Sequence, residues 1–146
     1  MRKMMMVVVL GIMPVAGRAC TMLAPFEMDQ IGGAELVIVG KVTGYQDLGT
    51  AWDAALVTVQ VEDALKGKAG GEVTFIWNGG MAQGPYETRA TGRVLIGAMR
   101  GGRIAVSDRA PDVRPDLPSI VQPYCGEVWM QPATKATVAE ARKALE

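Results

Sequence analysis

The sequence contains no histidine, few aromatic residues and no excess of charge of either sign. Without histidine the chain has no imidazole for a Ser-His-Asp or Cys-His nucleophile, or for zinc ligation. Aromatic residues are 5% of the 146 residues, too few for a base-stacking platform, and the formal net charge of +0 gives no attraction to nucleic acid. We therefore expect no enzyme, no intrinsic metal site or cofactor, and no nucleic-acid partner.

The chain also lacks an apolar run long enough to span a bilayer. Residues 1–19 instead have a basic start, a short apolar stretch, and small residues at Gly17 and Ala19. This pattern is typical of a secretory signal peptide cleaved before Cys20, or alternatively after Gly17. We expect a mature, single domain over residues 20–146 that is extracytoplasmic, secreted or periplasmic, with no transmembrane span. A lipid anchor on Cys20 is the less favoured alternative, because Arg18 stands where lipoprotein signals usually carry a small residue.

Removal of residues 1–19 changes the charge of the chain. The mature protein loses Arg2, Lys3 and Arg18, which leaves twelve basic residues against fifteen acidic ones and a net charge of −3. A negative charge argues further against binding to nucleic acid or to anionic membranes.

Only two cysteines are present, Cys20 and Cys125. In an oxidising compartment an even number most simply forms one disulfide, in this chain closing a loop of about one hundred residues. Two free thiols, or a lipidated Cys20 that leaves Cys125 alone, remain open. Two cysteines this far apart, without histidine, are a weak indication of a metal site.

Alternating and β-branched residues predict five strands, over residues 36–43, 54–65, 72–77, 94–99 and 103–106. Gly40 indicates a bulge or a sharp bend in the first strand, and Arg100-Gly101-Gly102 indicates a tight hairpin between the last two. A short helix is expected over residues 27–31, ended by Gly32-Gly33, and a C-terminal helix from Thr134. A later start of that helix, with Thr137 and Glu140 as a capping box, is the alternative.

Five short strands with a helix at each end predict a mainly β fold, a small five-stranded OB-like Greek-key barrel. A β-sandwich is the alternative, since periodicity does not separate the two. Residues 108–118 carry three prolines and are expected to form a long surface loop.

The order of these motifs resembles the netrin-like domain of the tissue inhibitors of metalloproteinases and their bacterial relatives. Cys20-Thr21 is followed by AELVIVGKVTG, VTVQVEDALKG, EVTFIW, GRVLIGAM and finally Cys125. The resemblance spans residues 20–130 and rests on motif order. It implies an OB-like barrel whose N-terminal cysteine chelates the zinc of a target protease.

The resemblance assigns the binding site to two residues. The α-amine and carbonyl of Cys20 would chelate the partner's zinc, and Thr21 would enter its specificity pocket. An amine and a carbonyl on one residue form a five-membered chelate ring that can displace zinc-bound water. The expected partner is a zinc metalloprotease or another envelope or extracellular protein. An envelope interaction or structural protein without a protease target is the alternative function.

The sequence departs from the family at its cysteines. Met22 stands where the family usually has its third-position cysteine. The loop that contains Gly84-Pro85-Tyr86 lacks the cysteine that usually pairs with the first cysteine of the family. In the family, the late cysteine pairs with the third position. A Cys20–Cys125 disulfide therefore implies an exchange of partners between neighbouring half-bridges.

Other residues receive simpler interpretations. Interleaved arginines and prolines argue against a calcium site at Asp108, Asp112 and Asp116, and Glu35 and Glu62 are expected on the surface. Trp77 and Trp129 are expected to pack in the core or at the barrel rim, with Trp77 mostly buried, whereas Trp52 is the best candidate for an exposed contact.

Overall fold

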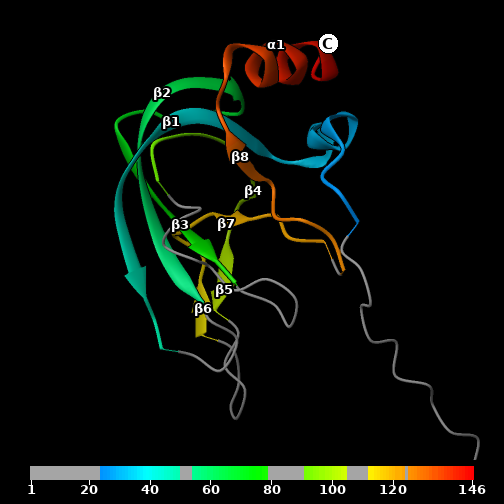
Figure 1. Ribbon diagram of the computed structural model, residues 1–146. Helices are drawn as coiled ribbons and strands as arrows, with labels where there is room; N and C mark the ends of the chain where they lie inside the picture. Colours follow the sequence, from blue (N-terminus) through cyan, green and yellow to red (C-terminus); the bar gives the residue numbers. More distant parts are fainter. Residues whose placement is uncertain (1–23, 50–53, 79–90, 105–111, 124) are drawn as a thin grey trace, which may run out of the picture.

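The computed structural model describes residues 24–49, 54–78, 91–104, 112–123 and 125–146 (Figure 1). The predicted signal peptide, Cys20, Thr21, Trp52 and Asp108 lie outside these residues. In chain order, the described elements are η1 (Met28–Gly33), β1 (Leu36–Asp47), β2 (Ala55–Lys66), β3 (Glu72–Trp77), β4 (Arg93–Met99), β5 (Gly102–Ile104), β6 (Asp112–Arg114), β7 (Ser119–Ile120), β8 (Met130–Pro132) and α1 (Lys135–Ala144).

Five strands close into a barrel in the order β1-β2-β3-β7-β4, with β4 pairing back to β1. The β3–β7 pair is parallel and the other four pairs are antiparallel. The expected mainly β, OB-like barrel with a C-terminal helix is therefore confirmed, and the β-sandwich alternative is wrong. Closure is favoured because it leaves no unpaired edge along the ring.

The long strand β1 bends around the barrel through irregularities in its pairing with β2. The register shifts at three places, one of them between Val39 and Gly40. A Cβ atom at Gly40 would lie 2.4 Å from the carbonyl oxygen of Gln60, so only glycine fits this close approach. The bulge predicted at Gly40 is confirmed.

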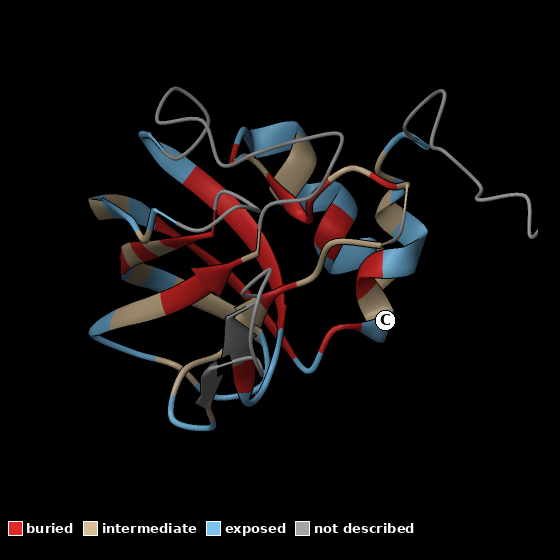
Figure 2. Cartoon of the chain, turned by 90° about the horizontal axis from the view of Figure 1, so that it is seen from below, coloured by how far each residue is buried: buried red, intermediate tan, exposed pale blue. Residues whose placement is uncertain are grey.

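Side chains of β1 and β4 alternate between two apolar layers. Ile38 and Ile96 point into the barrel, where they pack with Phe75 and Trp77. Val39 and Leu95 point outward and are covered by η1 and α1. Because both faces are covered, Leu36–Gly40 is continuously buried, as the red stretch of β1 in Figure 2 shows.

The sequence misidentified the fifth strand of the barrel. β5 overlaps the predicted range 103–106, but it pairs with β6 in a separate two-stranded sheet, so the expected hairpin with β4 is wrong. The barrel is completed by the two-residue strand β7, which pairs with Ile76, Ala98 and Met99. β6 also places a strand inside the segment expected to be a loop.

β7 and β8 together complete one edge of β4. Ala98 and Met99 pair with β7, whereas Val94, Leu95 and Ile96 pair with β8. Between these pairs, Gly97 N donates to the Trp129 carbonyl at 2.8 Å. The chain after β7 therefore returns beside β4 and leads directly into α1 (Figure 1).

Candidate functional site: the N-terminal segment and the face beside it

The N-terminal segment lies against the chain that precedes β8. Ala24 forms a parallel β-bridge with Gly126. Its N–H donates to the Cys125 carbonyl at 2.7 Å, and its carbonyl accepts from Glu127 N at 3.0 Å. These two hydrogen bonds fix the start of the described chain beside Cys125 (blue and orange in Figure 1).

Two side-chain contacts continue this anchoring. Glu127 Oε2 accepts a hydrogen bond from Phe26 N at 3.1 Å, and the Phe26 ring packs edge-on against Trp129 with centroids 6.1 Å apart. Trp129 is 8% exposed and belongs to the outer apolar layer, as expected for core packing. The barrel thus holds residues 24–26 in place through both polar and apolar contacts.

Cys125 has an unusual backbone conformation. Its φ of +58° is the single positive value among the described non-glycine residues, in the left-handed region that L-residues adopt at a cost. The carbonyl that receives the Ala24 N–H belongs to this same residue. Cys20 and Thr21 lie outside the described residues, so the Cys20–Cys125 disulfide and the zinc-chelating terminus stay predictions.

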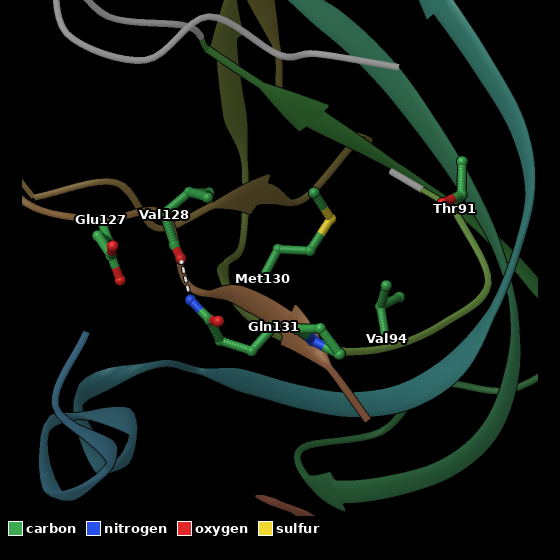
Figure 3. A pocket seen from close by; sticks show the side chains of 7 residues that line it. Thr91, Val94, Glu127, Val128, Met130 and Gln131 are labelled. Atoms are coloured by element: carbon green, nitrogen blue, oxygen red, sulfur yellow. Dashed lines mark hydrogen bonds between the residues drawn. The ribbon is translucent and has the colours of Figure 1, made fainter. Parts of the chain in front are cut away.

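Three adjoining hollows surround the N-terminal segment. The largest, about 420 Å³, opens between β4 and β8 and is shown in Figure 3. The second, about 320 Å³, lies between η1 and α1, and the third, about 120 Å³, lies beside Ala24. They share lining residues, so they form one continuous surface, which we call the three-pocket face; the shared residues are Phe26, Glu127, Gln131 and Pro132.

The largest hollow has an apolar floor and polar walls. Val94, Val128 and Met130 are buried beneath it, with at most 6% of each residue exposed. In Figure 3 Met130 and Val94 lie between Glu127 on one side and Thr91 on the other, and the Gln131 amide donates to the Val128 carbonyl at 3.5 Å. Such a hollow offers carboxylate, amide and hydroxyl groups around an apolar floor.

Carboxylates are the charged groups of this face. Glu27, Glu127 and Glu140 line the hollows, and no lysine or arginine of the described segments lines any of them. None of the three carboxylates forms a salt bridge within the described part of the chain. The nearby Arg93 is engaged elsewhere, by Glu62 at 2.6 Å and by the Ala133 carbonyl at 2.9 Å.

The remaining acidic candidates do not come together in a site. Glu62 pairs with Arg93, whereas Glu35 accepts from Arg100 N at 2.7 Å at the far end of β4, and both glutamates are exposed, as expected. Asp116 forms a salt bridge with Arg114 at 3.5 Å. Over the described residues no group of three or more acidic, histidine or cysteine side chains could hold a metal ion.

Sequence reasoning missed Glu127 and Gln131 as site residues. Both lie in the stretch after Cys125 that reads as a short extended piece, and their position beside Phe26 depends on the return of the chain along β4. The one available indication was that Glu127 and Gln131 flank the apolar run of residues 128–130.

Within the described residues, no helix is both long and apolar enough to cross a bilayer. Neither the protein-family models nor the curated proteins contain a match to this sequence.

Proposed function

We propose that the chain is an exported, netrin-like binding module that inhibits a zinc metalloprotease through a mature N-terminus at Cys20. The observation that carries this proposal is the anchoring of Ala24 to Cys125 and Glu127 by two backbone hydrogen bonds. It fixes the chain four residues after Cys20 on the barrel surface. A flexible terminus would lose more entropy on binding than one held in this way.

The position of Cys125 supports the predicted disulfide. Its carbonyl bonds to Ala24, and the four residues from Cys20 to Ala24 can span at most about 14 Å when extended. A Cys20–Cys125 bridge is therefore within the reach of the chain. A bridge between them would hold the α-amine and carbonyl of Cys20 at the edge of the three-pocket face.

The chemistry of the terminus fits an open zinc site. An unmodified α-amine titrates close to neutral pH, so a substantial neutral fraction is available to bind metal. Catalytic zinc is held by three protein ligands and keeps a position for water or substrate. The Cys20 amine and carbonyl would occupy that position, and Thr21 would follow into the adjacent pocket of the protease.

The first test is the intact mass of the exported protein, with and without reduction and thiol alkylation. The proposal expects a chain that begins at an unmodified Cys20 and is lighter than its reduced form by two hydrogen atoms. An acylated Cys20 or a different first residue would eliminate chelation by this terminus. The protein would then be an envelope interaction or structural protein, the alternative function.

Inhibition is tested with a matched pair of extended proteins. Mature protein with one alanine added before Cys20 has no α-amine on that residue, whereas one alanine added after Glu146 leaves the terminus unchanged. Against a panel of zinc proteases, the proposal expects inhibition by the mature and C-terminally extended proteins and its loss in the N-terminally extended one. Equal inhibition by all three would contradict chelation.

A further inference from the structure

We propose that the three-pocket face binds a basic segment of a partner protein, with a lysine or arginine side chain against Glu127 and its apolar neighbours over Val94 and Met130. This surface needs neither zinc nor the α-amine of Cys20, so it goes beyond the inhibitory terminus.

The charge of the face selects the partner. Three carboxylates line its hollows and, among the described residues, no cationic side chain does, so a basic group finds attraction in each hollow. Glu27 Oε2 accepts from Gln30 at 2.9 Å, but no salt bridge neutralises Glu27, Glu127 or Glu140 within the described residues. An acidic or phosphorylated segment would meet like charge throughout.

Glu127 is the central residue of this inference, because it lines both the largest hollow and the smallest one. It is partly buried, which reduces solvent screening of its charge. Its Oε2 accepts from Phe26 N, and its Oε1 has no hydrogen-bond partner within the described chain. A carboxylate oxygen can accept further hydrogen bonds, so Glu127 can receive an ammonium or guanidinium group while it still anchors Phe26.

The apolar floor of the largest hollow suits the apolar part of the proposed segment. Lysine and arginine carry long aliphatic stems that pack on apolar surface while their charged ends reach a polar partner. Val94 and Met130 form the buried floor of the hollow that Glu127 lines, and the exposed Pro132 offers apolar surface in the same hollow. Phe26 and Met28 line the adjoining hollow and can receive an apolar neighbour in an extended peptide. The face therefore fits a segment in which basic and apolar residues alternate.

The matched variants are E127Q and E35Q. Each variant removes one negative charge and keeps a side-chain oxygen that can accept the existing hydrogen bond. In E127Q this bond comes from Phe26 N at 3.1 Å, and in E35Q it comes from Arg100 N at 2.7 Å. Glu35 lies at the opposite end of β4 from the hollows, so its variant controls for the general loss of charge.

The probes are two twelve-residue peptides, one alternating lysine and leucine and the other glutamate and leucine, titrated into the full mature chain by NMR and calorimetry. We expect the lysine peptide to bind, with shifts at the amides of Glu127, Val128, Gln131 and Thr137. E127Q should weaken binding about fivefold, with E35Q unchanged, and added salt should weaken it further.

Three results would overturn the inference: no binding of the lysine peptide, equal binding of the glutamate peptide, or equal weakening by E127Q and E35Q. The readout uses neither zinc nor a protease. Failure of peptide binding is therefore distinguishable from failure of the inhibition assay, and either proposal can survive without the other.

Discussion

At the scale of single residues, the barrel depends on positions where no side chain fits. At Gly40 a Cβ atom would lie 2.4 Å from the Gln60 carbonyl oxygen and 2.6 Å from Val59 Cγ1. Both neighbours belong to β2, whose backbone is held by β1 on one side and β3 on the other. The bulge cannot relax by moving one flexible side chain, so this glycine is a requirement of closure.

We predict that G40A lowers the free energy of unfolding by about 2 kcal/mol, because the added methyl group forces the two strands apart. Urea unfolding followed by tryptophan fluorescence would measure the loss. G70A is the control, since a Cβ there would meet nothing within 4 Å and loses chain entropy only in the unfolded state. Similar stability of the two variants would contradict the steric argument.

At the scale of elements, α1 shows how a local signal defines a boundary. Thr134 is its N-cap, and the Thr134 hydroxyl accepts from Thr137 N at 3.1 Å. Arg142 and Lys143 lie in the last turn, where positive charge is favourable to the helix dipole. The start predicted at Thr134 is confirmed, and the later start with a Thr137–Glu140 capping box is wrong.

Replacing the cap should destabilise the helix without changing its packing. For T134A we expect a loss of about 1 kcal/mol, because the N–H of Thr137 loses its acceptor. T134S keeps the hydroxyl and should behave like the parent protein in the same thermal and urea unfolding experiments. An equal loss of stability in T134S would show that the Thr134 hydroxyl is not the cause.

At the scale of the whole molecule, two apolar layers share the same strands. The inner layer fills the barrel, and the outer layer joins β1 and β4 to η1 and α1. Polar contacts reinforce the second layer: Arg142 of α1 forms a salt bridge with Asp63 of β2, and Lys66 donates to the Gly32 carbonyl at 2.6 Å. The helices are therefore part of the folded unit and hold β8 and the three-pocket face in position.

Two alanines of α1 test this layer. Ala141 is fully buried in it, whereas Ala139 is exposed. A141E should lower the free energy of unfolding by about 3 kcal/mol or more, because it buries a carboxylate without a partner. A139E should change it by about 0.5 kcal/mol at most. If A141E is as stable as A139E in urea, the helix does not pack as described.

Whether the sequence alone predicts a feature depends on how far apart in the chain the contacting residues lie. The segment EVTFIW predicted β3, and its apolar end predicted the burial of Trp77. Gly40 and Thr134 each marked a local feature that the structure contains. β7 was missed because two residues after Pro118 carry no periodic pattern. Its existence as a strand depends on partners in β3 and β4 that lie far away in the chain.

The sequence by itself determined the approximate positions of β1 to β4, η1 and α1, because local propensity and periodicity act over a few residues. It also determined the exclusion of histidine chemistry and the expectation of an exported chain. Only the tertiary structure decided which strand closes the barrel, and that Ala24 lies beside Cys125 and Glu127. The physical reason is that the barrel closes through pairs of strands that lie far apart in the chain, and local propensity does not specify these pairs. This long-range pairing brings Phe26, Glu127 and Gln131 to one face.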